Sequence, residues 1–378
     1  MITVGRHESI AAIPRGEWDA IAASHSFFAS WGWLRYLEGA PGAAAGYLTV
    51  ADGELRAGWP VTTVTHPVNE RYDLDVLFPG LAGGAPVLAA PYVVAGACRG
   101  YRATAMSRKP ADMTALLAAT IGECRGTGGL AVLYLDTGGA ASVAAALHEL
   151  GRPSTPLLTD AEAVIGVHGR SLAGHLAASH GRLRRRMRRE MALFESSGLR
   201  VVRRPLRACA GALAPLHHEL LQRHGRDWDL ARTERSLRRL AAAAPAEPLL
   251  LLAVDETDEP VGFSLSYPWG DTLYVRVTGY RYARLRDSCE YFVLTCYEPI
   301  QRAALSGLAN VHLGLESLHA KLIRGAELSP LWSVIVPPGH DLPDGTVRAL
   351  NRARAAAFRE HYAAHRTAFT QSSWQAWQ

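Results

Sequence analysis

Hydrophobic positions in the first part of the chain follow strand and helix periods in turn. Residues 47–51 and 57–64 are rich in β-branched and aromatic side chains, which favours strands, and the Asp-Gly pair between them is typical of a hairpin turn. Residues 112–121 place apolar side chains at helical spacing, and residues 130–135 form a continuous apolar run that indicates a buried strand. This succession predicts a unit that mixes strands and helices around one core.

The second part of the chain shows the same two periods in another order. Ser171 begins a long helical stretch that ends before Gly198. Three consecutive antiparallel strands are predicted at 249–254, 262–267 and 272–277, because short turn-forming segments separate them. The other predicted elements are helices at 207–244 and 288–306, strands at 163–167, 199–203, 310–314 and 330–336, and a final amphipathic helix from Asp344 to about His365.

A proline-rich break at 152–156 predicts a domain boundary. A chain of 378 residues is expected to hold two domains of roughly 150 residues each. We therefore expect an N-terminal domain at 1–155, a second domain at 156–340 and a C-terminal helical extension at 341–378. The expected fold class is α/β in the mixed, α+β sense.

The basic residues of the chain are almost all arginines. Of its 40 lysines and arginines only Lys109 and Lys321 are lysines, which leaves 38 arginines, and the net charge is +5. Where a positive charge alone suffices, this sequence uses arginine, so a retained lysine suggests that an amine is needed at its position. Lys109 lies in a loop pattern, so Lys321 is the stronger candidate for chemistry.

Missing motifs exclude several functional classes. The sequence has no G-x-G-x-x-G after a first strand, no G-x-x-x-x-G-K-[ST] loop, no H-E-x-x-H helix and no G-x-S-x-G turn. Its five cysteines include no C-x-x-C pair, so we expect neither a metal site nor a disulfide framework. No apolar run reaches about 18 residues and no signal-peptide pattern is present, so we expect a cytoplasmic protein without a membrane span.

Four segments at 30–38, 183–191, 259–279 and 312–325 carry a family resemblance. In this order they resemble the tandem GNAT-like N-acyltransferases related to the Fem aminoacyltransferases, a group that includes bacterial chains assigned to peptidoglycan biosynthesis. The resemblance implies two GNAT-like domains, each a mixed and largely antiparallel sheet flanked by helices, with the catalytic one second. Where members of the group often carry Gln-Gly-Glu-His, this chain has Ser-Leu-His-Ala at 317–320, which leaves the acceptor and the catalytic base open.

The segment Lys321-Leu-Ile-Arg-Gly325 is the predicted reactive centre. The resemblance implies a lysine near the reacting carbonyl and the donor phosphates, and an ammonium can stabilise an oxyanion as the amine attacks. An exposed lysine at the end of a strand is the ordinary alternative. A general base or acid would come from the remaining catalytic candidates, which are Glu316, Glu290, Tyr297 and His319.

Arginines near two helices are the predicted donor site. The helix within 171–196 is crowded with them, and a helix near 288 begins beside three more where an ordinary GNAT enzyme has a glycine-containing pyrophosphate loop. These arginines could bind coenzyme A, the pantetheine arm of a carrier protein or a tRNA acceptor stem, whereas a solvated charged face is the ordinary alternative. The predicted donor-binding residues are Arg281, Arg284, Arg286, Arg185, Arg189, Arg324 and Gly325.

The resemblance also implies that the first domain helps to bind the acceptor. Its candidates are Trp31, Tyr72, Asp73 and Asp75, since the carboxylates could hold a cationic amine, although core packing would also explain the aromatic residues. The leading hypothesis is an N-acyltransferase that uses a coenzyme A or carrier-protein thioester as co-substrate, with no permanently bound cofactor. An aminoacyl-tRNA-dependent aminoacyltransferase and a non-catalytic two-domain binding module are the alternatives.

Overall fold

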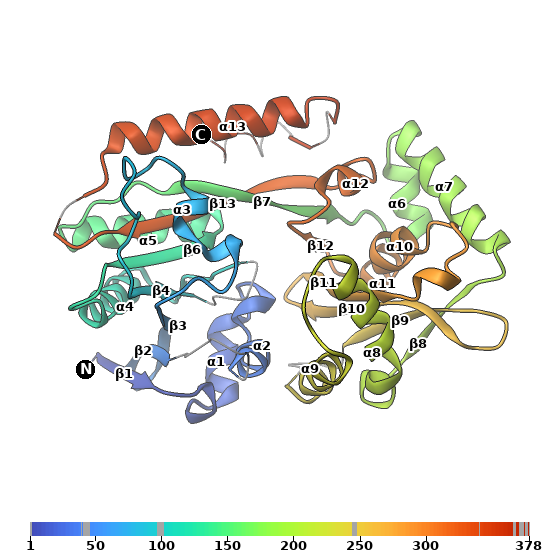
Figure 1. Ribbon diagram of the computed structural model, residues 1–378, viewed down its shortest axis with the longest axis horizontal. Helices are drawn as coiled ribbons and strands as arrows, with labels where there is room; N and C mark the ends of the chain where they lie inside the picture. The colour runs from blue at the N-terminus through green and yellow to red at the C-terminus, as the bar shows by residue number, and fades with distance from the viewer. Residues whose placement is uncertain are drawn as a thin grey trace. The chain divides into compact units, whose positions relative to one another are not determined.

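A computed structural model describes residues 2–38, 40, 46–96, 102–243, 248–339, 341–365, 368, 369, 374 and 377. The chain forms two compact units. The first contains Met1–Ala161 together with Leu328–Gln378, and the second contains Glu162–Glu327. Both units mix strands and helices, which confirms the predicted fold class (Figure 1).

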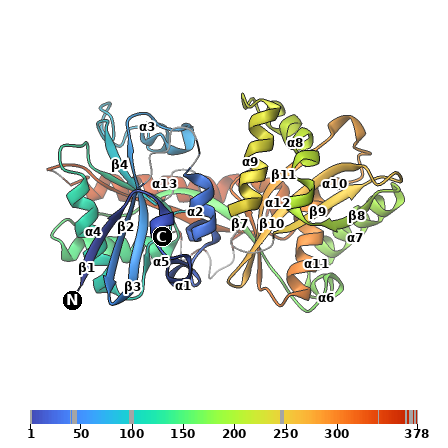
Figure 2. The ribbon, with the colours of Figure 1, turned by 90° about the horizontal axis from the view of Figure 1, so that it is seen from below.

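The first unit is built on strands in the order β1-β2-β3-β4-β6-β13-β7. Figure 2 shows β1, β2 and β3 side by side, as the antiparallel pairing of these strands requires. The strands are β1 (Thr3–His7), β2 (Gly46–Asp52), β3 (Glu54–Val64), β4 (Tyr92–Ala95), β5 (Met106–Ser107), β6 (Leu130–Leu135), β7 (Leu157–Gly166) and β13 (Glu327–Val336). The helices are α1 (Arg15–Ala22), α2 (Trp31–Leu37), α3 (Leu74–Leu77), α4 (Pro110–Glu123), α5 (Thr137–Glu149) and α13 (Asp344–His361), with 3-10 turns at Ile10–Ala12, Phe27–Ala29 and Glu70–Tyr72.

The second unit is built on strands in the order β7-β12-β11-β10-β9-β8. These strands are β8 (Arg200–Arg204), β9 (Leu249–Val254), β10 (Pro260–Trp269), β11 (Thr272–Tyr280) and β12 (Asn310–Gly314). The helices are α6 (Leu172–Ala178), α7 (Gly181–Ser196), α8 (Leu206–Arg223), α9 (Leu230–Ala243), α10 (Glu290–Phe292), a π-helical segment η5 (Val293–Tyr297), α11 (Glu298–Leu305) and α12 (Leu318–Leu322), with a 3-10 turn at Tyr282–Arg284. The three consecutive antiparallel strands predicted from the sequence are confirmed as β9, β10 and β11.

Two predicted helices are each divided in the structure. The stretch from Ser171 breaks between α6 and α7, where the His180 ring accepts a hydrogen bond from the backbone N–H of Leu183 at 3.3 Å and so starts a new helix. The predicted helix at 207–244 forms α8 and α9, with the turn between them closed by Asp229. Local side-chain caps thus interrupt an otherwise continuous helical pattern.

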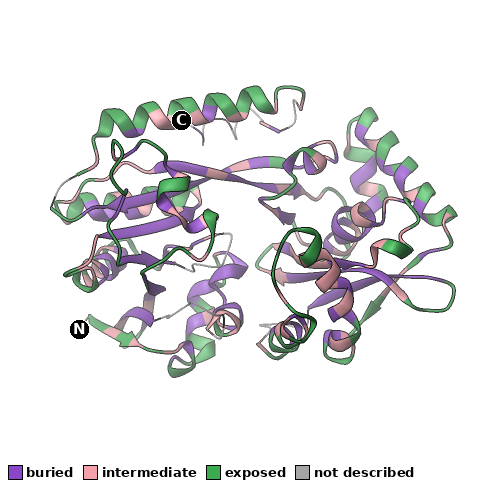
Figure 3. Ribbon diagram, viewed as in Figure 1, coloured by how far each residue is buried: buried purple, intermediate pink, exposed green. Residues whose placement is uncertain are grey.

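The chain groups differently in space from the division predicted at residues 155 and 340. β13 pairs with β6 through Trp332–Val336, and α13 donates from Arg354 to the carbonyl of Leu158 at 2.8 Å. The C-terminal strand and helix therefore belong to the first unit, while β7 and β13 each contribute residues to both units. The buried residues concentrate on the strands, whereas α13 is largely exposed (Figure 3). Among the described residues, no helix is long and apolar enough to cross a membrane.

Candidate functional site

The second unit contains a parallel strand pair that separates toward its carboxyl ends. β11 and β12 pair at three positions only, the last of them Tyr274 with His312. A β-bulge in the neighbouring β10–β11 pair leaves Arg276 as an extra residue just beyond this point. In the described residues no backbone hydrogen bond joins the rest of β11 to the end of β12. Beyond Tyr274, β11 therefore has no strand partner on this side in the described residues, and the His217 ring lies 2.7 Å from the Thr278 carbonyl oxygen of the same stretch.

Lys321 lies at the end of β12, on α12. Its side chain is 5% exposed, and its Nζ donates to the carbonyl oxygens of Leu313 at 2.5 Å and Gly314 at 3.4 Å. The ammonium thus holds the strand end and places a buried positive charge where β12 leaves β11. An arginine fork would not fit this pair of carbonyls in the same way, because its donors lie in one plane.

Glu190 of α7 joins three elements of the second unit through one buried carboxylate. Arg324 donates to it twice, from Nε at 2.9 Å and from Nη2 at 2.8 Å, and the Tyr297 hydroxyl donates to it as well. The guanidinium of Arg324 also stacks over the Phe292 ring of α10. Burial and the hydrogen bond to Glu190 raise the pKa of Tyr297 well above its usual range, so the phenol keeps its proton.

Sequence reasoning assigned no role to Glu190, although one signal was present. It is the only acidic residue in the arginine-rich part of α7, and it follows the apolar positions Leu183 and Met187 at helical spacing. The buried pair of His312 and Glu162, whose Nε2 and Oε2 atoms are 2.9 Å apart, was also missed. This pair lies beside the Tyr274 ring, at the point where β11 and β12 separate.

Glu290 is the first residue of α10, and its side chain turns back to the loop that precedes the helix. Its carboxylate is buried and accepts hydrogen bonds from the backbone N–H groups of Arg286 at 2.6 Å and Ser288 at 3.0 Å. Backbone N–H groups ahead of a helix often bind an anionic group of a ligand. Here the protein's own carboxylate takes these donors.

Two of the three predicted donor arginines around this loop are held by acidic partners. Arg284 donates to Asp255, and Arg286 donates twice to Glu256 at 2.7 Å. The hydrogen bond from Arg286 lowers the pKa of Glu256 to about 2. Arg281 donates its backbone N–H to Val261 at 2.9 Å. Two of the three guanidiniums in this group are therefore committed to ion pairs.

Arg185 and Arg189 have different surroundings. They line a pocket of about 380 Å³ on α7. Its other lining residues are Arg182, Arg186, Glu190, Leu193 and Cys289. Gly325 contributes to the same region by packing, since a Cβ at this positive-φ position would lie 2.7 Å from the Leu183 side chain.

Glu316 and His319 are both exposed, beyond the end of β12. The pKa of Tyr291 is raised to about 12, mainly by burial, and the negative charge of the Glu316 carboxylate makes a smaller contribution to this rise. The charge of Glu316 is therefore felt at Tyr291 of α10, near the place where β11 and β12 separate (the strand gap). Of the four predicted bases and acids, Glu290 and Tyr297 have buried partners, while Glu316 and His319 face solvent.

The predicted acceptor residues of the first unit all make structural contacts. The Trp31 indole donates to the carbonyls of Ile10 and Ile13, and Tyr72 is buried against the Tyr134 ring. Asp73 caps α3, and the Asp75 carboxylate accepts from the backbone N–H of Val87 at 2.7 Å. These contacts explain the residues without a ligand, and their role in acceptor binding stays a prediction.

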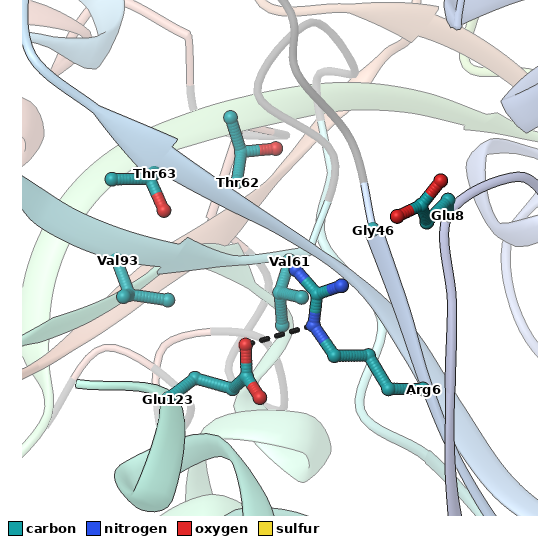
Figure 4. Close-up of a pocket in the computed structure, with 8 residues that line it drawn as sticks. All are labelled: Arg6, Glu8, Gly46, Val61, Thr62, Thr63, Val93 and Glu123. Atoms are coloured by element: carbon teal, nitrogen blue, oxygen red, sulfur yellow. Dashed lines mark hydrogen bonds and ion pairs between the residues drawn. The ribbon is translucent and has the colours of Figure 1, made fainter. Parts of the chain in front are cut away.

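A second pocket lies in the first unit, around β1, β3 and the end of α4 (Figure 4). In this pocket the Nε of Arg6 donates to Oε2 of Glu123 at 3.0 Å, and Glu8 is a further lining residue. Because its cation is paired internally, this pocket has no uncompensated charge to attract a phosphate. The described residues contain no group of three His, Cys, Asp or Glu side chains that could hold a metal ion.

Comparison with known proteins places this geometry in a family. Residues 181–322 match the sequence model of the family described as "Acetyltransferase (GNAT) domain". No curated protein matches the chain in sequence. The structure is similar to that of FemX, with 14% identity and a TM-score of 0.58 over 86% of this chain and 96% of the FemX chain.

A conserved protein of unknown function from Bacteroides thetaiotaomicron VPI-5482 is also similar. It shows 13% identity and a TM-score of 0.57 over 89% of this chain and 100% of its own. Identities this low establish a common fold alone. The region matched by the family model, residues 181–322, contains β11, β12 and Lys321. The chain therefore contains an acetyltransferase (GNAT) domain in residues 181–322, and it is an acyltransferase with a Fem-like tandem GNAT fold.

Proposed function

We propose that the chain is an N-acyltransferase that transfers an acyl group from a thioester to an amine. The observation that carries the proposal is the separation of β11 from β12 after Tyr274, inside the matched acetyltransferase domain. A pantetheine arm is extended and contains two amides, so it can pair with the free edge of β11 as an added strand would. The thioester carbonyl would then lie near the end of β12.

The reaction requires that the attacking amine be neutral. Its nitrogen forms a bond to the thioester carbon, the C–S bond breaks, and the amine proton and the thiolate leave as a free thiol. We assign removal of the proton to Glu316, directly or through water, because it is the exposed carboxylate closest in sequence to the end of β12. Lys321 supplies positive charge close to the carbonyl oxygen, where negative charge develops.

Acyl transfer can be measured without knowing the natural substrate. Purified protein would be incubated with short- and medium-chain acyl-coenzyme A thioesters and a panel of amino acids, polyamines and amino sugars. Thiol release and the mass of the amide product report the reaction, and protein carrying Lys321→Met is the control. We expect thioester-dependent amide formation that the control variant largely loses.

The donor class is decided in the same assay. Aminoacyl-tRNA is offered in place of the thioester, with and without ribonuclease treatment. Amide formation only from aminoacyl-tRNA, abolished by ribonuclease, would contradict the thioester proposal. Acyl transfer from neither donor, with ligand binding intact, would favour a binding module instead.

A further inference from the structure

We propose that the arginine-lined pocket on α7 binds the diphosphate of the acyl donor; this rests on the proposed function. Arg182, Arg185, Arg186 and Arg189 lie at i, i+3, i+4 and i+7, so they form one stripe along the helix. The stripe spans about 10.5 Å at 1.5 Å per residue. This length suits a small nucleotide carrying two or three phosphates, such as coenzyme A.

The charge of this stripe is left uncompensated by the protein. Within the described residues, the side chains of Arg182, Arg185 and Arg189 make no hydrogen bond or ion pair, and that of Arg186 reaches only Glu190 at 3.5 Å. The Glu190 charge is already offset by Arg324, so the four lining arginines leave the pocket at about +4. By contrast, Arg284 and Arg286, which are also predicted donor residues, have acidic partners.

The helix itself is destabilised by these arginines. Like charges three and four residues apart repel each other, and cations in the first turns oppose the helix dipole. α7 has no acidic residue in its first turn to offset this. An anionic ligand on the stripe would remove both penalties, whereas an ordinary solvated face carries charges of both signs.

The pocket is also connected to the predicted reactive centre. Its Glu190 is bonded to Arg324, three residues after Lys321, and its Cys289 directly precedes α10. The loop amides ahead of α10 are taken by Glu290 and are closed to a phosphate. The arginine stripe is therefore an anion site that is linked through Glu190 and Arg324 to the segment carrying Lys321.

A small ligand fits these features better than RNA does. An RNA stem would contact a broad basic surface and release many counterions. The pocket of about 380 Å³ has the size of a small-molecule site, and its four cations form a single row.

The test compares adjacent arginines of the same helix. Arg189 lines the pocket and Arg188 does not, although both are exposed, so Arg189→Gln and Arg188→Gln remove the same charge at neighbouring positions. Isothermal titration would measure the Kd of coenzyme A, inorganic pyrophosphate and pantetheine, which has the arm without the diphosphate. Arg185→Gln repeats the pocket substitution one turn away.

We expect Arg189→Gln and Arg185→Gln each to raise the Kd of coenzyme A about tenfold, the size of one charge-assisted hydrogen bond. Arg188→Gln should change it less than about twofold, and the Kd of pantetheine should not change. Pyrophosphate should compete with coenzyme A in the unmodified protein. Because these side chains are exposed, thermal unfolding should show every variant folded.

Two results would overturn the proposal. Equal weakening by Arg188→Gln and Arg189→Gln would mean that only overall charge matters. Binding of an RNA acceptor-stem minihelix that depends on Arg185 and Arg189, without binding of coenzyme A, would assign the stripe to RNA. The experiment measures binding, so its result is separate from turnover. If the protein transfers acyl groups but Arg189→Gln leaves the Kd of coenzyme A unchanged, this inference is wrong and the proposed function stands. If coenzyme A binds in the pocket but no acyl transfer occurs, the proposed function is wrong and this inference stands.

Discussion

The two units contain the same kind of parallel strand pair, but in the described residues only the first has a backbone hydrogen bond across the space beyond the pair. In the first unit β4 and β6 pair from Val93–Leu130 to Ala95–Val132. Beyond them the chain returns, and the backbone N–H of Ala103 donates to the carbonyl of Tyr134 at 3.0 Å. In the second unit the described residues show no such return between β11 and β12. The first gap is bridged by the protein's own backbone, whereas the second has no backbone bridge in the described residues, and it is there that we propose the donor arm binds.

The chemistry around the two gaps differs as well. Near the end of β12 the second unit buries Lys321, Arg324 and Glu190. At the corresponding place of the first unit, Tyr134 lies in a left-handed backbone conformation, and its hydroxyl donates to the carbonyl of Arg71. Buried charges are unfavourable unless they are paired or used in function. The two units therefore share this strand pair, and in the described residues only the second places a buried lysine, arginine and glutamate near the end of it.

The largest expected effect comes from breaking that polar centre. Glu190→Gln leaves the Arg324 guanidinium buried without its carboxylate, and we expect the free energy of unfolding to fall by about 4 kcal/mol. Urea unfolding measures this loss. The double variant Glu190→Gln/Arg324→Met removes both charges and should recover part of it.

A surface pair supplies the matched control. Arg200 and Asp258 are both about half exposed, so Asp258→Asn should cost less than about 1 kcal/mol. If Glu190→Gln and Asp258→Asn destabilise the protein equally, the second unit has no special polar centre.

The second expected effect tests the filled gap of the first unit. Gly96 has a φ of +85°, and a Cβ there would lie 2.6 Å from the Cβ of Ala103. Gly96→Ala should therefore combine backbone strain with a steric clash and destabilise the protein by about 3 kcal/mol. Gly80 has a similar φ of +80° with no atom within 4 Å of a Cβ, so Gly80→Ala should cost only about 1 kcal/mol.

Urea unfolding of both glycine variants separates strain from the clash. Acyl transfer by the folded fraction should be unchanged in both, because the first gap takes no ligand. Equal destabilisation by the two substitutions would mean that the returning chain does not pack tightly in the gap.

The sequence predicted the fold better than it predicted the partners of charged residues. The antiparallel strands and their turns follow from local alternation, which is why β9, β10 and β11 were found. On α7 the buried residues are Leu183, Met187, Glu190 and Phe194, so a glutamate shares the apolar face of the helix. Its carboxylate is stable there because of Arg324, which is 134 positions away and invisible to a local pattern.

The predicted donor arginines show the same limit. The sequence could place Arg284 and Arg286 beside a helix start, but it could not show that Asp255 and Glu256 would pair with them. The sequence singled out Lys321 because only two of the 40 basic residues are lysines. Its side chain is buried near the end of β12, where an exposed lysine would have been the ordinary expectation. Its role in catalysis stays a prediction.

The third expected effect concerns Lys321. Lys321→Met keeps most of the side-chain volume but removes the ammonium that donates to Leu313 and Gly314. We expect kcat to fall at least about tenfold, the scale of a lost oxyanion donor. Thermal unfolding should be measured alongside, because the two carbonyls also lose a donor. Unchanged kcat in folded protein would remove Lys321 from the reactive centre.

The smallest expected effect is a count of binding sites. If only the gap between β11 and β12 is open, the protein binds one thioester analogue per chain, although it contains two units. Titration calorimetry with a non-hydrolysable acyl-coenzyme A thioether gives the stoichiometry. Gly80→Ala should leave both the stoichiometry and the Kd unchanged, since that residue belongs to the first unit and a Cβ there would meet no atom within 4 Å. Two equal sites per chain would show that the backbone of Ala103 yields to a ligand, and the distinction between a filled and an open gap would then fail.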